Sequence, residues 1–434
     1  MRLFLLLFPV FLFFCGELYS QKRVPLREKR GASPVKYSAE AKDRRIVTIP
    51  AYYTKKWREF RGLWVVTAWN LDFPKTTTPY AFMQNYSRLV AQAKRKGINT
   101  ILFQVRPSCD AFYPSRFNPW SQYLTGIPNG GFRSFDPLAY MIKETHKQGL
   151  AFHAWLNPYR LKGASPLSKW QVLAQLPKGH FAKRNPACVL SIPTKKGNLL
   201  MLDPGHPSVM QHLISTVREL VRKYPLDGLC IDDYFYPYEG IGNQDHASYR
   251  KWNKWKLTLP AWRVNNINMM VRNLAGIVRG GKNHGGERMQ FGVSPFGIWM
   301  NYKNNKLGSL TKGHESYAGH YADTRLWVKK RFVDYIAPQL YWSFTHNSAP
   351  FACLADWWAN TVKGTGVRLY IGLTLQSFNP KAPHWSNSRI LANQFLYLSA
   401  IPEVKGVTLF SAKGLLAPAN RCAKTNVGTA LHYW

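Results

Sequence analysis

The chain has 434 residues, enough for one large α/β barrel or two medium domains, and either arrangement would bury an ample core. Its formal net charge of +37 comes from scarce acids, 22 Asp plus Glu, as much as from 59 Lys plus Arg, and favours a polyanionic partner. The basic residues are scattered and show no zinc-finger spacing or aromatic RNA-binding motif, so no nucleic-acid partner is expected. An anionic glycan or an acidic envelope surface would account for the positive charge as well as nucleic acid would.

Residues 1–20 are typical of a secretory signal peptide. Arg2 precedes an unbroken apolar run from Leu3 to Phe14, which is too short to span a bilayer. Cys15 stands three residues after Leu12, a spacing that also fits a lipoprotein signal, although the two phenylalanines between them are larger than the residues usual there. The segment predicts an exported protein, periplasmic or associated with the outer membrane, and a lipid anchor on Cys15 would be its only attachment to a membrane.

Residues 21–56 are basic, contain proline and show weak periodicity. They predict a tether between the exported N-terminus and a folded domain over residues 57–434.

Eight short apolar runs follow and predict β-strands. They are Gly62–Ala68, Thr100–Val105, Leu150–Leu156, Gly228–Ile231, Phe291–Ser294, Tyr335–Tyr341, Leu369–Thr374 and Val407–Phe410. Amphipathic helical patterns separate most of them; the first ends at Gly97, the second runs from Asp136-Pro137 to Gly149, the third starts at Pro207, and the later ones have looser boundaries. These helices are expected over residues 82–93, 137–149, 207–220, 262–278, 324–332, 354–362 and 390–398.

Strands that alternate with helices predict a parallel sheet closed into a (β/α)8 TIM barrel. An open doubly wound sheet is the alternative, but no Gly-rich phosphate loop follows the first strand. The longest excursions follow strands three and four, over Asn157 to Pro204 and Tyr234 to Pro260, and are expected to build the walls of a cleft.

Two adjacent acids end the fourth strand. The segment Leu226–Pro237 contains a buried apolar run followed at once by Asp232 and Asp233. A strand interior disfavours an unpaired carboxylate, whereas the carboxyl-terminal mouth of a parallel barrel is where catalytic side chains collect. These two acids are therefore the predicted catalytic residues. The alternative is a loop pair that is solvated or bound to nearby arginines.

The other strand ends are rich in polar and aromatic groups, which suits a carbohydrate site because hydroxyls need polar partners and sugar faces stack on rings. The 16 Trp and 23 Tyr agree with this reading. The predicted substrate-binding residues are Arg106, Asp110, Trp155, Asn157, Tyr159, Asp203, Tyr234, Gln339, Tyr341 and Trp342. Further polar or aromatic residues at strand ends are Trp69, Asp72, Gln104, Arg160, Ser294 and Gln376.

Several of these residues also have a structural interpretation. Arg106 either contacts the substrate or holds one of the strand-four acids ionised. Asp203 precedes a predicted helix and could cap it or form a turn. His153, within a strand, is more often a core histidine than a catalyst, and Trp299 and Trp342 could be packing residues.

The chain resembles the bacterial glycosyl hydrolase-like 10 family from about Arg58 to Ala412. The resemblance rests on the segments Arg61–Val65, Asn70–Pro74, Phe103–Pro107, Asp110–Tyr113, Pro119–Ser121, Tyr123–Gly126, His153–Arg160, Asp227–Gly228, Asp232–Pro237, Ser294–Trp299 and Ala337–Trp342. It implies a TIM-barrel glycosidase outside the cytoplasm, often a lipoprotein, and some members look like enzymes that cut peptidoglycan strands stripped of their stem peptides. The family commonly has His where this chain has Cys230. Because Cys230 lies beside the predicted site, this difference leaves open the pKa values of the site's acids and the substrate preference.

Glycosidases generally use two carboxyl groups on either side of the scissile bond. Asp232 is the first candidate because it directly follows the last apolar strand residue, and Asp233 is the second. Neighbouring strand residues point to opposite sides, so the two flank one bond only where the strand bends. If it does not bend, the partner carboxylate would be Asp110, Asp203 or Asp72.

The leading hypothesis is hydrolysis of an anionic cell-wall glycan, since muramic acid carries a carboxylate. A non-catalytic glycan-binding barrel is the alternative. Metal-dependent hydrolysis is a third class, but His153, His206 and His346 lack tight ligand spacing, and no metal or cofactor is expected. The five cysteines after the signal form an odd, dispersed set without disulfide or CxxC spacing.

Overall fold

The eight predicted strands close into one parallel barrel, which confirms the (β/α)8 fold. The computed structural model describes residues 22–434 except 29–30, 39, 41, 379–380 and 382–383. The barrel order is β10-β11-β12-β13-β3-β4-β5-β9. These strands are β3 (Phe60–Val65), β4 (Thr100–Arg106), β5 (Ala151–Leu156), β9 (Gly228–Ile231), β10 (Gln290–Val293), β11 (Tyr335–Ile336), β12 (Arg368–Thr374) and β13 (Val404–Phe410). Closure excludes the open doubly wound sheet.

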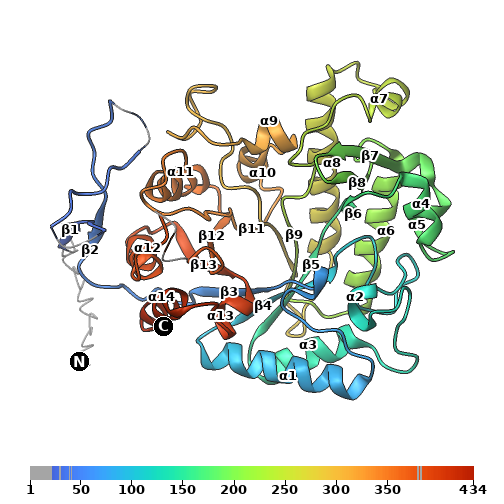
Figure 1. Ribbon diagram of the computed structural model, residues 1–434, viewed down its shortest axis with the longest axis horizontal. Helices are drawn as coiled ribbons and strands as arrows, with labels where there is room; N and C mark the ends of the chain where they lie inside the picture. The colour runs from blue at the N-terminus through green and yellow to red at the C-terminus, as the bar shows by residue number, and fades with distance from the viewer. Residues whose placement is uncertain (1–21, 29–30, 39, 41, 379–380, 382–383) are drawn as a thin grey trace, which may run out of the picture.

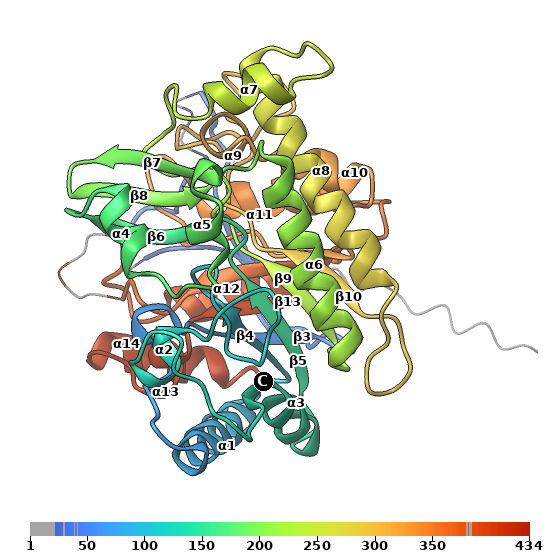
Figure 2. The same cartoon turned by 90° about the vertical axis from the view of Figure 1, so that its right-hand side faces the viewer.

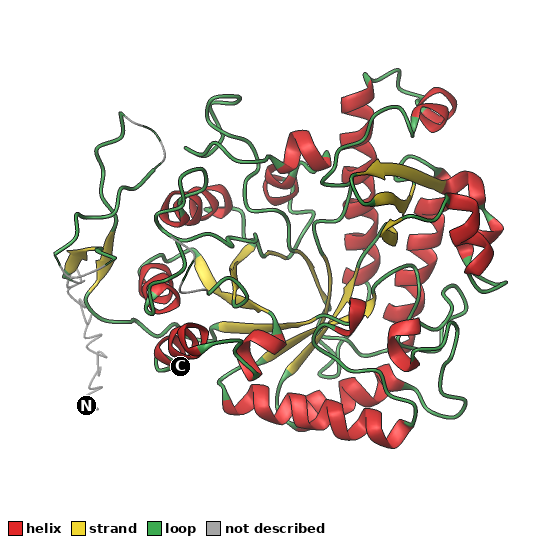
Figure 3. Cartoon of the chain, viewed as in Figure 1, coloured by secondary structure: helices red, strands yellow, loops and turns green. Residues whose placement is uncertain are grey.

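Helices surround the strands in Figures 1 and 3. They are α1 (Pro79–Arg95), α2 (Gln122–Thr125), α3 (Pro137–Lys147), α4 (Lys169–Gln175), α5 (Phe181–Arg184), α6 (Pro207–Lys223), α7 (His246–Trp252), α8 (Leu259–Arg279), α9 (Ser316–His320), α10 (Thr324–Lys329), α11 (Phe351–Val362), α12 (Ile390–Ser399), α13 (Ala412–Leu416) and α14 (Arg421–Leu431), with short 3-10 turns η1 (Ala68–Asn70) and η2 (Pro186–Cys188). Thr78 caps α1 and Asp136 caps α3, each just before a proline. The helices predicted to start at Pro137 and Pro207 begin at those residues.

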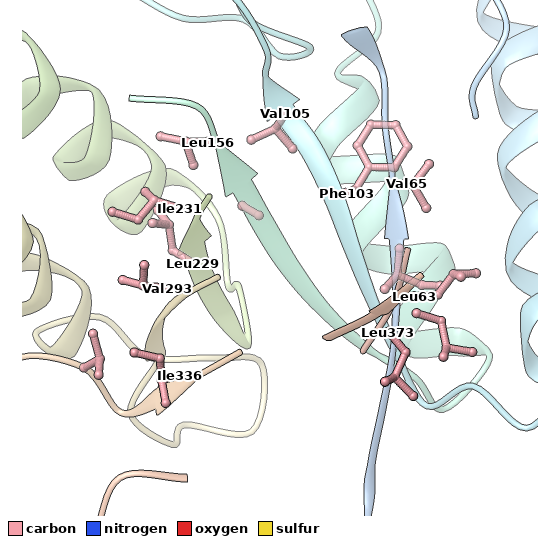
Figure 4. Packing of buried hydrophobic residues seen from close by; sticks show 14 of the residues in the cluster. Leu63, Val65, Phe103, Val105, Leu156, Leu229, Ile231, Val293, Ile336 and Leu373 are labelled. Atoms are coloured by element: carbon pink, nitrogen blue, oxygen red, sulfur yellow. The ribbon is translucent and has the colours of Figure 1, made fainter. Parts of the chain in front are cut away.

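The strands bury both faces. Outward side chains such as Phe103 and Ile231 pack between strands and helices (Figure 4). Inward side chains form a separate cluster that includes Trp64, Leu102 and Trp155. This alternation follows from the two-residue period of a strand and explains why the runs read as continuously apolar.

His153 belongs to that interior, as the structural interpretation expected. Its Nδ1 lies 2.9 Å from the hydroxyl of Tyr335, and burial lowers the pKa of the imidazole to about 4. The histidine is a packed core residue below the barrel mouth.

The sixth strand is shorter than its apolar run predicted. Regular pairing covers only Tyr335 and Ile336, because Pro338 has no N–H to donate. The chain nevertheless stays in the sheet direction, since Gln339 makes parallel bridges to Phe296 and Gly372. The strand end therefore still delivers its side chains to the barrel mouth.

The excursion after β5 holds a small antiparallel sheet of β6 (Arg160–Ser165), β8 (Gly197–Leu202) and β7 (Val189–Thr194), in that order. It carries α4 and α5 beside it in Figure 2. The excursion after β9 holds α7 and leads into α8, which packs against α6. The two predicted insertions are thus both structured.

The segment predicted as a tether is instead packed on the barrel over its described residues. β1 (Arg23–Pro25) and β2 (Thr48–Pro50) form an antiparallel pair, seen at the left of Figure 1. Val35 and Val47 are buried, and the Tyr37 hydroxyl donates to Asp356 of α11 at 2.8 Å. A few buried apolar residues are enough to dock this basic segment on the barrel. They are too few to give the sequence a periodic pattern, so the docking was not predicted.

The predicted signal peptide over residues 1–20, with Cys15, lies outside the described residues. Among the residues that are described, no helix has the length and apolar character needed to cross a membrane.

Candidate active site

Two adjoining hollows form a cleft at the carboxyl ends of the barrel strands. The inner hollow, about 360 Å³, lies over the barrel interior and is lined by Trp64, Val66, Ala68, Leu71, Gln104, Trp155, Asp232, Asp233, Ser294, Gln339, Tyr341, Gln376 and Phe410. The outer hollow, about 280 Å³, lies between the β6–β8 sheet and the loop after β9, and its lining includes Tyr159, Gly163, Leu199, Met201 and Tyr236. Both hollows share Trp69, Arg160, Tyr234 and Tyr238. The cleft is therefore continuous and lined with rings.

Asp232 stands at the floor of the inner hollow. Its Oδ2 accepts from Trp155 Nε1 at 3.0 Å and from Asn157 Nδ2 at 3.2 Å, both delivered by the end of β5. Arg160 is the nearest cation, with Nη2 at 4.0 Å. Burial raises the pKa of Asp232 to about 7 and outweighs the opposing effect of Arg160. The carboxyl can therefore hold a proton near neutral pH.

Asp233 lines the same inner hollow as Asp232. Regular pairing ends at Ile231, and the Phe235 N–H donates to the Asp233 carbonyl at 2.9 Å, so the chain turns as it leaves the barrel. The Asp233 side chain accepts from the hydroxyl of Tyr238. Two neighbouring acids can face the same cleft only where the strand bends, and the chain does bend at Asp232 and Asp233.

Arg160 and two rings mark the junction of the hollows. The guanidinium carbon of Arg160 lies 4.2 Å from the centroid of Tyr234 and 5.3 Å from that of Trp69. Trp69 is 62% exposed and has a left-handed backbone, with φ of 54°. Such a conformation is unfavourable for a bulky residue and is kept only where its surroundings hold it. An exposed indole held in this way is suited to stack on a sugar.

The Trp69 turn is held by its neighbours. Asn70, also left-handed, donates to the carbonyls of Phe73 and Tyr123 at 3.1 and 2.6 Å. Asp72 accepts from the Val66 N–H at 2.8 Å and also from the Ser411 hydroxyl and the Lys413 N–H, just after β13. Asp72 therefore supports the turn and is not among the residues that line the cleft.

Five of the ten predicted binding residues line the cleft. Trp155, Tyr234, Gln339 and Tyr341 line the inner hollow, and Tyr159 lines the outer hollow. Asn157 is buried beneath the cleft, where it donates to Asp232. The Tyr159 hydroxyl has no hydrogen-bond partner among the described residues.

Arg106 does not reach the cleft, and both roles considered for it were wrong. An extra residue in β4 shifts its pairing with β5 between Gln104 and Arg106. This bulge turns Arg106 outward, where it donates to the carbonyl of Asn157 at 2.6 Å and to Asn118 at 3.0 Å. Arg106 is a buried anchor for the turn that presents Asn157.

Three further predicted residues also lie away from the cleft. Asp110 accepts from the Ser108 N–H at 3.0 Å and borders a separate hollow, and burial raises the pKa of its carboxyl. Asp203 accepts from the Gly205 N–H at 2.9 Å and from Ser248, as the turn interpretation expected. Trp342 packs against Phe296 with ring centroids 5.4 Å apart. Of the carboxylates considered, only Asp232 and Asp233 line the cleft.

Sequence reasoning missed Tyr238 and Trp64 altogether. Tyr238 lies past the Pro237 stop, where no strand-end rule applies. Trp64 is an inward strand residue and looked like core. Trp69, Gln104 and Arg160 were recognised at strand ends but not assigned to the site, although all three line the inner hollow.

Cys230, where the family commonly has His, points into the barrel interior with Trp64 and Trp155. Burial raises the pKa of its thiol. Over the described part of the chain, no three His, Cys, Asp or Glu side chains converge as metal ligands would.

Comparison with known proteins agrees with this geometry. The sequence profile described as "Glycosyl hydrolase-like 10" matches residues 59–387. "Glycosyl hydrolase YngK" of Bacillus subtilis strain 168 is 38% identical over 365 residues, 82% of this chain and 69% of that protein. "Glycosyl hydrolase DigH" of Escherichia coli K12 is 35% identical over 395 residues, 86% and 88% of the two chains. The PgaB (BpsB) glycoside hydrolase domain of Bordetella bronchiseptica shares the fold, with a TM-score of 0.52 at 13% identity over 86% of this chain and 99% of that one.

Proposed function

The chain belongs to the glycosyl hydrolase-like 10 family and is a glycoside hydrolase acting on a polysaccharide, and we propose that it cleaves an envelope glycan, namely peptidoglycan strands without stem peptides. The observation that carries the chemical part of this proposal is the pair Asp232 and Asp233 in one ring-lined hollow.

Asp232 acts as the general acid. Its pKa of about 7 keeps a proton available for the leaving oxygen, which an exposed aspartate would have lost. Trp155 and Asn157 fix the carboxyl from the side of β5. Asp233, held by Tyr238, is the second carboxylate and acts on the anomeric carbon directly or through water.

Rings and charge position the polymer. Trp69, Tyr234 and Tyr238 line both hollows, so consecutive sugars stack along the cleft. Arg160 stands among them as the cation for a substrate carboxylate. The net charge of +37 draws an anionic strand toward this surface.

Charge attraction makes capture salt-dependent. Raising the ionic strength should slow the hydrolysis of muramic-acid-containing polymer severalfold at low substrate concentration, because screening weakens long-range attraction. Hydrolysis or binding of a short neutral oligosaccharide serves as the control and should change little. Equal effects on both substrates would contradict an anionic substrate.

The site of action we propose is the bacterial envelope. The support is the apolar run over residues 3–14, which is typical of a secretory signal. If the protein is a lipoprotein, Cys15 is the residue that carries the lipid anchor.

The direct test is digestion of peptide-free wall glycan by the wild type and by Asp232→Asn, with new reducing ends identified by mass. The variant should lose about 100- to 10,000-fold in rate, the usual contribution of a general acid. Asp203→Asn is the matched control, since it changes another buried aspartate outside the cleft and should retain activity. Full activity of Asp232→Asn would refute the assignment.

A further inference from the structure

Two further hollows lie on the outside of the barrel, over its helices. The larger, about 820 Å³, lies between α6 and residues 114–120 of the loop after β4, and the smaller, about 510 Å³, lies along α3. They adjoin at Lys223, which lines both. Over the described part of the chain they share no lining residue with the cleft, so together they form a separate groove, here called the flank groove.

The flank groove is lined by cations at helical spacing. Arg218 and Arg222 lie one turn apart on α6, and Lys143 and Lys147 lie one turn apart on α3. All four residues are exposed, and their side chains make no ion pair or hydrogen bond with any residue that the structure describes. Like charges four residues apart repel each other and destabilise a helix. An anion bound in the groove would offset this repulsion on both helices.

The acid in the larger hollow is already engaged. Glu219 stands between Arg218 and Arg222 on α6, but its carboxylate accepts from the Arg116 backbone N–H at 2.7 Å and from the Ser115 hydroxyl. These bonds fasten the loop after β4 to α6 and so fix one wall of the groove. The Arg116 side chain is exposed on that wall and adds a third guanidinium.

The acid in the smaller hollow is engaged as well. Asp136 caps α3, accepts from the Tyr224 hydroxyl at 2.8 Å and pairs with Lys223 at 3.2 Å. Lys223 also donates to the Pro114 carbonyl at 3.0 Å, so it joins α3, α6 and the loop at the point where the two hollows meet. The groove therefore has a fixed shape, and the charge left for a ligand is positive.

The lining of the groove indicates the class of ligand. A guanidinium presents a fork of N–H donors that matches the oxygens of a carboxylate or a phosphate. The partly buried rings of Phe117 and Trp120 line the same hollow and can pack against the apolar face of a sugar. Two joined hollows with cations in each suit a chain with repeated anions better than a single ion, and a flat lipid surface would leave them unfilled.

We propose that the flank groove is a second binding site, separate from the catalytic cleft, for a polysaccharide chain that carries carboxylate or phosphate groups. Arg218 and Arg222 bind the anions from α6, and Lys143 and Lys147 bind them from α3. The groove takes no part in bond cleavage, so this inference goes beyond the proposed function and does not rest on it. A second site on one protein keeps it attached to a polymer while the cleft is empty.

The test measures the binding of the full chain to three immobilised polysaccharides at physiological ionic strength. They are polygalacturonate, which carries carboxylates, phosphomannan, which carries phosphates, and dextran, which is neutral. The double variant Arg218→Gln with Arg222→Gln should bind at least one of the two anionic polymers about tenfold or more weakly than wild type, because it loses two charge-assisted contacts. Its binding to dextran should not change.

The matched control is Arg88→Gln with Arg95→Gln. It removes two exposed arginines from α1, outside the flank groove, and changes the net charge by the same amount. It should weaken binding to the anionic polymers by less than about threefold, the effect of a general loss of attraction. Glutamine and arginine have similar helix propensities, so both double variants should melt no lower than wild type.

The outcomes separate the possible ligands. A loss confined to polygalacturonate supports a carboxylate-bearing chain, and a loss confined to phosphomannan supports a phosphate-bearing one. Equal losses in the two double variants, or unchanged polymer binding in the α6 variant, would overturn the proposal. So would an α6 variant that binds both polymers normally but loses binding to phosphatidylglycerol vesicles, since the surface would then face a membrane. A wild type that cleaves no wall glycan, with polymer binding that still depends on Arg218 and Arg222, would refute the proposed function and leave this inference standing.

Discussion

The cleft floor and the base of the loop after β9 each hold a buried aspartate with an arginine nearby, in very different arrangements. Asp245 accepts two bonds from Arg263, at 2.8 and 2.6 Å. Asp232 has Arg160 no closer than 4.0 Å, because that guanidinium lies over the ring of Tyr234. Complete pairing compensates a buried charge and ties elements together, whereas incomplete pairing leaves a carboxyl whose pKa is about 7. The first arrangement serves the fold and the second serves proton transfer.

The largest effect on stability is expected where pairing is complete. Arg263 also donates to Tyr321 at 2.8 Å and to the Gly242 carbonyl at 2.6 Å, so it joins α8 to two loops. Asp245→Ala leaves this guanidinium buried without its anion and should lower the free energy of unfolding by about 3–5 kcal/mol. Denaturant unfolding measures the loss, and Asp232→Asn should show none of comparable size at neutral pH.

The double variant sharpens the same comparison. Replacing both partners, as Asp245→Ala with Arg263→Met, removes the uncompensated charge and should recover part of the stability lost by the single variant. A double variant as unstable as the sum of its parts would show that the ion pair is not what stabilises this loop.

The next largest effect is the pH dependence of stability, which should distinguish Asp232 from Asp245. The folded pKa of Asp232, about 7, lies above the ordinary value near 3.8. The contribution of the Asp232 carboxyl to the free energy of unfolding is therefore fully present below pH 4 and is lost as the pH rises through 7. Asp232→Asn lacks this loss, so it should gain stability relative to wild type between pH 4 and pH 8, by on the order of a few kcal/mol.

Asp203, whose pKa burial raises to about 6, acts in the same direction but is present in both proteins and cancels in the difference. In activity, hydrolysis should fall as the pH rises above about 7, because the general acid then loses its proton. A stability difference independent of pH would contradict a buried, protonatable Asp232.

The barrel could be predicted because its eight strands are apolar runs, and the helices between them show helical spacing of apolar residues and Pro or Gly residues near their ends. The β6–β8 sheet could not, since β6 and β8 mix polar, glycine and apolar residues without a two-residue period and are buried along only part of their length. The N-terminal hairpin, from β1 to β2, was missed for the same reason, since few of its side chains dock on the barrel. Short strands that depend on tertiary contact leave little periodic signal.

The candidate site shows a similar limit. A strand end identifies which residues lie near the mouth, and this placed Asp232 and Asp233 correctly at the cleft. It does not identify the direction of a side chain after a bulge, and so Arg106 was assigned to the wrong face. Nor does it show that Trp64, an inward residue in the middle of a strand, lines the cleft as well as packing in the barrel interior.

The smallest expected effect compares one hydroxyl in each region. Tyr238 donates to Asp233 in the cleft, and Tyr321 accepts from Arg263 in the structural cluster. Tyr238→Phe removes a charge-assisted hydrogen bond from the second carboxylate and should lower kcat about tenfold with little change in stability. Tyr321→Phe makes the same chemical change beside Arg263 and should lower stability by about 1–2 kcal/mol while kcat stays within about twofold of wild type. If Tyr238→Phe instead lost only stability, Asp233 would belong with Asp245 as a structural acid, and Asp232 would need another partner in catalysis.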